Sequence, residues 1–343
     1  LSAKDKCVVN HSRNGDGGLL RLPQQVDFKI CKSFDCLLSK RTGFMRRIAI
    51  MALGMYLLSI LHGCTGETKK SSGANHSEQK EVTEVFSGNF ETREIHVDKN
   101  GMDIYGVVHI PTGIEEKMPA IILSHELGAT LDRVKGYGEA LAKAGYVTCC
   151  FDFCGGGWNS RSDGKLLDMS VLTEKADLEA VLNEVKKMDF VDTDSIYLMG
   201  NSQGGLVTAM TASEHKDEIR AIILIYPAFS IYDDVHEMFD SEEEIPDTHY
   251  LLGLRLGQIY FKDIWDREPY GIVREYGKNI LLIHGDRDSI VPIEYSNKLA
   301  ETVDNVEYHV IRGADHGYLG ENFDLAVSYI LDFISKNQQS NCD

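Results

Sequence analysis

The residue whose sequence surroundings most clearly indicate reactivity is a serine that has one glycine two positions before it and another two positions after it. Ser202 lies in the sequence G-N-S-Q-G, after the apolar stretch 195–199 and at the start of a helix-like stretch, 202–214. This pattern at a strand-to-helix turn is typical of a nucleophile elbow, which lifts one hydroxyl above the sheet edge. The turn strains the serine backbone, and side chains in place of Gly200 and Gly204 would collide with neighbouring elements. Ser202 is the predicted nucleophile.

Two residues that could activate this hydroxyl follow later in the chain. Asp288 comes after the apolar stretch 279–283, and His316 comes after 306–311. Both positions lie just past a strand, where open parallel sheets place their ligand sites. A histidine can take the serine proton and return it to the leaving group, while a buried carboxylate fixes the imidazole tautomer. The pattern predicts acyl transfer by Ser202, His316 and Asp288.

Other residues near these positions leave alternatives open. Asp286 could cap the turn after its strand, and Asp288 could cap the following helix. Asp315, beside His316, is a rival carboxylate. His284 follows an apolar strand directly, which is more typical of a packed, hydrogen-bonded histidine than of a base.

Two backbone N–H groups are expected to hold the oxyanion that forms during attack. One belongs to Gln203, the residue after the nucleophile. The other is expected from Leu127, in the loop after the apolar stretch 120–124, with Glu126 as the alternative. Only main-chain atoms are needed, so the side chains at these positions can shape the pocket.

Strand-like and helix-like stretches alternate around these residues. The apolar strand-like stretches are 105–110, 120–124, 146–151, 195–199, 221–226, 279–283 and 306–311. The amphipathic helix-like stretches are 131–144, 171–188, 202–214, 293–303 and 322–336. Such alternation indicates parallel βαβ units, with antiparallel strands 91–98 and 103–110 at one edge.

The segment between the strands 221–226 and 279–283 is too long for a simple crossover. Long insertions in compact domains are usually functional. We expect a small helical cap over Ser202, at about 228–275. Its aromatic residues could line a pocket for an acyl group or simply attach the cap to the core.

The motifs together resemble α/β-hydrolases of the serine aminopeptidase-like and cinnamoyl (feruloyl) esterase group, over about residues 91–335. Besides the elbow, the likeness includes F-D-F-C-G-G-G at 151–157 and H-G-x-x-D-x-x-V-P at 284–292. One departure is Glu126, which stands where the family usually has glycine.

The resemblance implies an α/β-hydrolase domain at 89–338, with a mostly parallel central sheet flanked by helices and a small helical cap insertion. It implies the same triad as the residues do, and the same oxyanion donors. The expected function is hydrolysis of small-molecule carboxylic esters, of the small acyl or cinnamoyl type, without a cofactor. A serine peptidase with the same triad is the alternative, and a non-catalytic surface-binding lipoprotein is a further one.

The amino-terminal part predicts export and a lipid anchor. Residues 45–63 have a basic start, an apolar core and a small residue before Cys64, as in a bacterial lipoprotein signal. Residues 64–88 indicate a flexible tether. We expect attachment through Cys64 to a bacterial membrane, on its periplasmic or outer face; an uncleaved signal anchor and a chance apolar run are the alternatives. Residues 1–44 precede the signal and are expected to be a disordered gene-start artefact.

The net charge argues against nucleic acid as a partner, and the cysteine positions argue against a disulfide framework and a metal site. The formal net charge is −18, which disfavours nucleic acid because acidic surfaces repel phosphate. The eight cysteines do not suggest a disulfide framework. Cys149, Cys150 and Cys154 lack the spacing of a zinc site, so no metal is expected. The pattern does not indicate an oligomeric state.

Overall fold

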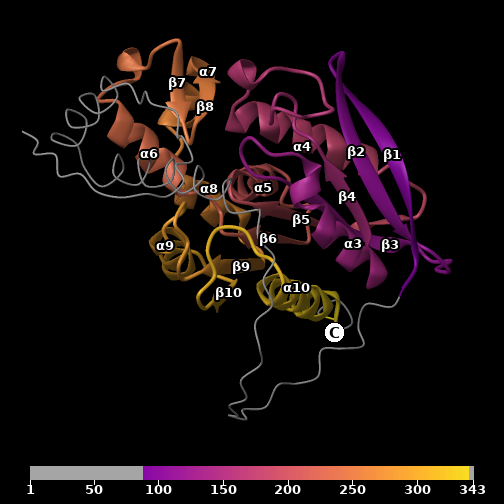
Figure 1. Ribbon diagram of the computed structural model, residues 1–343. Coiled ribbons are helices and arrows are strands. Elements are labelled where there is room, and N and C mark those ends of the chain that lie inside the picture. The colour runs from indigo at the N-terminus through magenta and orange to yellow at the C-terminus, as the bar shows by residue number, and fades with distance from the viewer. Residues whose placement is uncertain (1–87, 340–343) are drawn as a thin grey trace, which may run out of the picture. The chain divides into compact units, whose positions relative to one another are not determined.

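The computed structural model describes residues 88–339, which form the domain in Figure 1. The expectations for residues 1–44, for the signal at 45–63, for Cys64 and for nearly all of the tether lie outside these residues. Within 88–339, no helix has the length and apolar character needed to span a membrane.

An eight-stranded sheet has the order β1-β2-β4-β3-β5-β6-β9-β10. Its strands are β1 (Phe90–Lys99), β2 (Met102–Pro111), β3 (Met118–Ser124), β4 (Val147–Phe151), β5 (Val191–Asn201), β6 (Ala221–Ile225), β9 (Ile280–Gly285) and β10 (Val306–Ile311). β2 pairs antiparallel with β1 and β4, and all pairings from β4 onward are parallel. This is the mostly parallel sheet that the α/β-hydrolase resemblance implies.

The inner strands are apolar on both faces. Every residue of β4, β6 and β9 is buried. A strand with helices on both sides has no face in water, so its sequence is a continuous apolar run and not an alternating one. β10, at the edge, is only partly buried along most of its length.

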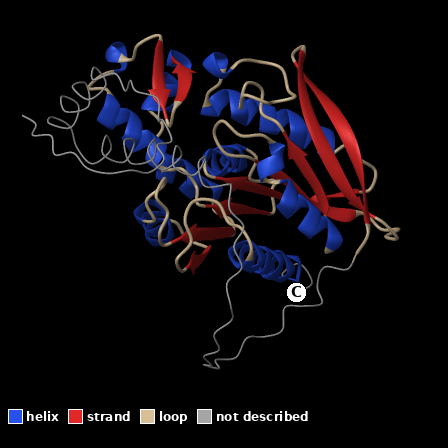
Figure 2. Cartoon of the chain, viewed as in Figure 1, coloured by secondary structure: helices blue, strands red, loops and turns tan. Residues whose placement is uncertain are grey.

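Helices cover both faces of this sheet (Figure 2). They are α3 (Lys135–Lys143), α4 (Val171–Val185), α5 (Gln203–Glu214), α9 (Glu294–Thr302) and α10 (Glu321–Gln339), with short 3-10 turns η1 (Leu131–Arg133) and η2 (Leu166–Asp168). α3 and α10 share one apolar cluster with strand residues such as Leu123, Met199 and Ile283. α4 and α5 pack together against the other face. Loops, and not these helices, therefore lie at the carboxyl ends of the strands.

The insertion between β6 and β9 contains a β-hairpin in addition to helices. Its elements are α6 (Ser230–Met238), η3 (Glu242–Glu244), β7 (Thr248–Leu251), β8 (Leu254–Gly257), α7 (Gln258–Trp265) and α8 (Pro269–Tyr276). Leu252 and Gly253 join the two strands with φ of 50° and 81°, and positive φ at both positions is characteristic of a type I′ turn. The Leu254 side chain lies against Gly128, so the hairpin reaches the loop after β3.

Candidate active site

Ser202 lies at the junction of β5 and α5 in a strained backbone conformation. Its φ is 51° and its ψ is −120°, a region that residues other than glycine rarely adopt. The Ser202 N–H donates to the Ile225 carbonyl at 3.0 Å, and the Ser202 carbonyl accepts from the Ala228 N–H at 2.9 Å. The last residue of β6 and the segment after it therefore hold both backbone groups of Ser202.

The flanking glycines are required because no side chain would fit. A Cβ on Gly200 would lie 2.1 Å from the Gly204 carbonyl oxygen. A Cβ on Gly204 would lie 2.5 Å from the carbonyl oxygens of Ser124 and His125. The elbow is thus packed against its own helix and against the end of β3, as the pattern predicts.

Asp288 and His316 lie in hydrogen-bonding contact in the loops after β9 and β10. The Nδ1 atom of His316 is 2.7 Å from Oδ2 of Asp288. The other carboxylate oxygen accepts from the N–H groups of Ile290 and Val291 at 2.9 and 2.8 Å. The Asp288 side chain is fully buried and that of His316 is 9% exposed. This contact leaves Nε2 of His316 available to act as a base.

The two alternative carboxylates, Asp286 and Asp315, form hydrogen bonds within and between the loops after β9 and β10 instead. Asp286 Oδ1 accepts from the Gly313 N–H at 2.5 Å. Asp315 Oδ1 accepts from the N–H and the hydroxyl of Ser289, each at 2.8 Å. Both are exposed contacts between the loops after β9 and β10.

His284 contacts Asp288 as well, which the sequence did not predict. It is fully buried, and its Nε2 lies 3.2 Å from Asp288 Oδ2 and 3.0 Å from the Val291 carbonyl. Nε2 must carry the proton because a carbonyl can only accept, so Nδ1 accepts from the Ser296 hydroxyl at 2.6 Å. The motif H-G-x-x-D contains this pair, but its spacing alone does not show contact.

The environment of Asp288 keeps it ionised. Burial by itself would raise the pKa of Asp288. The hydrogen bonds with His284 and His316 outweigh burial and hold that pKa well below its ordinary value. A permanent negative charge beside Nδ1 favours the imidazolium that a base becomes.

Ser202 and His316, the predicted nucleophile and base, both contact the chain segment at the end of β6 and just after it. The Tyr226 ring packs against the His316 ring with centroids 4.4 Å apart. The Ser202 backbone bonds to Ile225, directly before Tyr226, and to Ala228, two residues after it. Among the described residues, no hydrogen bond joins Ser202 Oγ to His316. Their convergence remains a prediction.

The expected oxyanion donors lie in the elbow itself and in the loop after β3. Gln203 is the first residue of α5, so its N–H has no acceptor within the helix. In the described part of the chain, no acceptor bonds the N–H of Leu127 or of Glu126. Either of these two could therefore complete the pair. The Gln203 side chain points elsewhere, to Glu174 and Tyr260.

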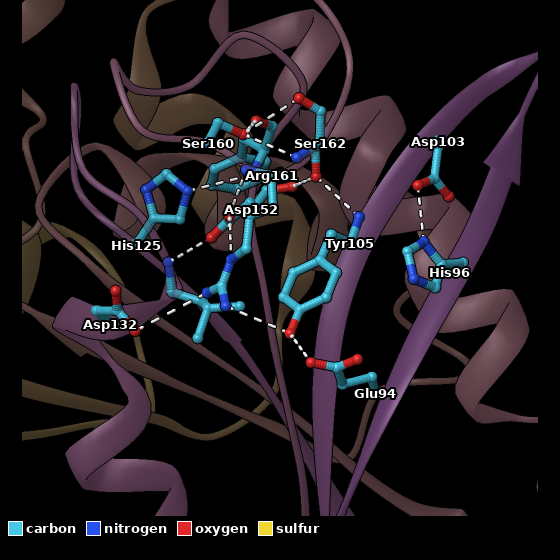
Figure 3. A network of polar contacts seen from close by, with 12 residues as sticks. Glu94, His96, Asp103, Tyr105, His125, Asp132, Asp152, Ser160, Arg161 and Ser162 are labelled. Atoms are coloured by element: carbon cyan, nitrogen blue, oxygen red, sulfur yellow. Dashed lines mark hydrogen bonds and ion pairs between the residues drawn. The ribbon is translucent and has the colours of Figure 1, made fainter.

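A buried polar cluster fastens the loop that carries Leu127 (Figure 3). His125 Nε2 accepts from the Phe153 N–H at 3.1 Å, so Nδ1 carries the proton and donates to the Glu126 carbonyl at 2.8 Å. Asp152 accepts from the N–H groups of Leu131 and Arg161 at 2.7 and 2.8 Å. The F-D-F-C-G-G-G motif thus positions the loop after β3.

Three cysteines near this cluster are free and buried. Burial raises the pKa of the Cys149 and Cys154 thiols to about 12 and that of Cys150 well above its usual range. Such thiols are poor nucleophiles at neutral pH. Among residues 88–339, no His, Cys, Asp and Glu side chains are grouped as a metal site would require.

Known proteins resemble this chain in sequence and in fold. Esterase EstD of Thermotoga maritima is 25% identical over 224 residues, which are 58% of this chain and 52% of EstD. The chain therefore spans about half the length of that relative. Est1E from Butyrivibrio proteoclasticus, solved with ferulic acid bound, is 27% identical with a TM-score of 0.66 over 71% of this chain and 99% of that chain. A second Est1E structure is 25% identical with a TM-score of 0.64, over 74% of this chain and 100% of that chain.

A family profile also matches the part of the chain that carries the site. The match to the prolyl oligopeptidase family covers residues 136–340, more than half of the 343 residues. This range includes the elbow and the loops of Asp288 and His316. The fold is that of an α/β-hydrolase, and the chain belongs to the prolyl oligopeptidase family.

Proposed function

We propose that this protein is a carboxylic ester hydrolase in which Ser202 is the nucleophile, His316 the base and Asp288 the residue that orients the base. The observation that carries the proposal is the 2.7 Å contact between His316 Nδ1 and a buried, ionised Asp288. The strained Ser202 at the elbow supports it. Serine hydrolases on unrelated folds use this same set of groups.

The reaction proceeds through an acyl-enzyme. His316 Nε2 removes the Ser202 proton as Oγ bonds to the ester carbonyl carbon. The carbonyl oxygen becomes an oxyanion, held by the N–H groups of Gln203 and Leu127, each worth about 3 kcal/mol in the transition state. Collapse breaks the ester C–O bond, and the alcohol leaves with the proton from His316. Water then repeats the sequence and releases the acid and Ser202.

The substrate is a small acyl or cinnamoyl ester. The similarity to Est1E, whose structure holds ferulic acid, and to Esterase EstD supports this class. Aromatic side chains are frequent in the insertion over residues 228–275 and would suit a planar acyl group.

Replacing the nucleophile tests the proposal directly. Ser202→Ala is expected to fold normally and to lose hydrolysis of short p-nitrophenyl esters by several orders of magnitude, because no other hydroxyl is placed at the elbow. Ser213→Ala, on the same helix α5, is the matched control and should retain activity. A fluorophosphonate should label the wild type and not Ser202→Ala. Full activity in Ser202→Ala would refute the assignment.

A serine peptidase is the second candidate, because the family match is to prolyl oligopeptidases. The same triad would attack an amide carbonyl. A panel of methyl ferulate, short p-nitrophenyl esters and aminoacyl naphthylamides separates the two. Faster turnover of the naphthylamides would favour the peptidase.

Attachment to a bacterial membrane through a lipid on Cys64 completes the proposal. The basic start, apolar core and small residue before Cys64 support it. An alkyne fatty acid fed to expressing cells should label the wild-type protein and not Cys64→Ala. Equal labelling of both would exclude this anchor.

A further inference from the structure

Tyr226, directly after β6, has a backbone conformation that tyrosine rarely adopts. Its φ is 39° and its side chain is almost fully buried. Its N–H donates to the Ile283 carbonyl at 2.7 Å. The adjacent Ile225 and the nearby Ala228 both bond to the Ser202 backbone. The strain therefore persists because β9 on one side and the elbow on the other hold this segment.

The Tyr226 ring lies against the imidazole of His316. The ring centroids are 4.4 Å apart and the planes meet at 52°. The Tyr318 ring packs against the Tyr226 ring in an edge-to-face arrangement, with centroids 5.1 Å apart. An aromatic wall on one face of the imidazole restricts its rotation about the bond to Cβ.

The Tyr226 hydroxyl bonds to the end of β5 and to the loop after β3. It donates to Glu126 Oε1 at 3.3 Å and accepts from Asn201 Nδ2 at 3.1 Å. Asn201 directly precedes the nucleophile, and Glu126 directly precedes Leu127. One side chain thus contacts the elbow, the base and the oxyanion loop.

The Glu126 carboxylate is itself held in place. Its side chain is 11% exposed, and Oε1 lies 3.7 Å from Arg133 Nε. Oε2 is buried and has no hydrogen-bond partner among the described residues. The Arg133 guanidinium lies 3.0 Å from the point where a Cβ of Gly317 would be, beside His316. A series of contacts thus runs from Tyr226 through Glu126 and Arg133 to the loop that carries His316.

We propose that Tyr226 is a positioning residue that aligns His316 with Ser202 and with the oxyanion loop, and that Glu126 is the partner through which it does so. This inference rests on the proposed function of Ser202. It gives a role to a glutamate that stands where the resembling family usually has glycine.

Tyr226→Phe tests the role of the hydroxyl while keeping the ring against His316. We expect kcat for p-nitrophenyl esters to fall about tenfold with KM changed less than about twofold, because misalignment affects the reacting geometry and not binding. Tyr318→Phe is the matched control, since its buried hydroxyl has no partner among the described residues; its kcat should stay at the wild-type value. An unchanged kcat in Tyr226→Phe, or a loss confined to KM, would overturn the proposal.

Glu126→Ala tests the same link from the other side and does not depend on how Tyr226→Phe folds. It should lower kcat about as much as Tyr226→Phe does, and the double variant should be no worse than either, because residues that act through one bond are not additive. Multiplying effects in the double variant would overturn the link.

Ser202→Ala separates this inference from the proposed function. If Ser202→Ala is inactive while Tyr226→Phe and Glu126→Ala keep the wild-type kcat, only the positioning role is wrong. If Ser202→Ala keeps its activity, both fall.

Discussion

Asp288 and Glu174 are both buried carboxylates next to the proposed machinery, yet their pKa values are shifted in opposite directions. Asp288 contacts His316, and Glu174 contacts the side chain of Gln203. The pKa of Asp288 lies well below its ordinary value, whereas burial raises the pKa of Glu174 to about 8. Burial therefore does not decide the charge by itself.

The number of hydrogen-bond donors explains the difference. Asp288 has contacts with two imidazole nitrogens and two backbone N–H groups. Glu174 Oε2 accepts only from Gln203 Nε2 at 2.7 Å, and Oε1 has no partner among residues 88–339. The nearby Asp177 charge raises the pKa of Glu174 further. A buried carboxylate stays ionised where hydrogen-bond donors of the protein take the place of the water that would solvate its charge.

Asp288→Asn removes the ionised carboxylate of this pair and should have the largest effect on kcat. The amide cannot carry the charge and can bind the wrong imidazole tautomer, so kcat should fall about 10³- to 10⁴-fold. Asp286→Asn, two residues earlier with an exposed carboxylate, is the control. Steady-state kinetics on both variants decide the matter. A loss of only a few fold in Asp288→Asn would return the role to Asp315.

Glu174→Gln replaces the other member of the pair, the carboxyl group whose pKa is raised. The folded protein keeps a proton on Glu174 that the unfolded chain releases above its ordinary pKa of 4.5. Stability from this residue is therefore lost as the pH rises from about 4.5 to about 8. Glutamine imitates the protonated form, so the variant should lose less stability between pH 5 and pH 9, by on the order of 3 kcal/mol. Urea unfolding at both pH values measures this.

Glu179→Gln, on the same helix α4, is the control of opposite sign. Burial would raise the pKa of Glu179, but its contacts with Lys175 and His215 lower it. Its contribution to stability is present above its ordinary pKa and is lost on acidification. This variant should therefore be less stable than the wild type at neutral pH. If Glu174→Gln behaves in the same way, Glu174 is ionised in the folded protein.

His284→Phe sharpens the comparison by removing one donor from Asp288 and leaving His316 in place. We expect kcat to fall about tenfold, because a less firmly held carboxylate orients the base less well. The measurement is kcat at neutral pH on protein whose circular dichroism is native. Unchanged kcat would mean that the N–H groups of Ile290 and Val291 suffice.

Tyr260→Phe should have the smallest effect. The Tyr260 hydroxyl, on α7 of the insertion, donates to Gln203 Oε1 at 2.7 Å. Its removal should lower the unfolding free energy by about 1 kcal/mol. Tyr250→Phe, at an exposed position of β7, should change nothing. Equal unfolding curves for both variants would show that this bond adds no stability.

Much of the fold was predictable because its signals are local. The strands β4, β6 and β9 are buried on both faces, so their sequences are continuous apolar runs. The β-hairpin β7–β8 was not predicted. Its turn is Leu252-Gly253, and leucine at a positive φ carries none of the Asn-Gly or Asp-Gly signal of a type I′ turn.

The sequence by itself determined where the strained turn at Ser202, the proposed nucleophile, lies, since the steric demands of a tight turn are met within five residues, from Gly200 to Gly204. It also determined the order in which a carboxylate and an imidazole follow. Only the tertiary structure decided that Asp288, and not Asp286 or Asp315, meets His316, and that His284, Tyr226 and Glu126 lie in the same set of contacts. The physical reason is that a hydrogen bond depends on distances of a few tenths of an ångström between loops from different strands, which no local pattern encodes.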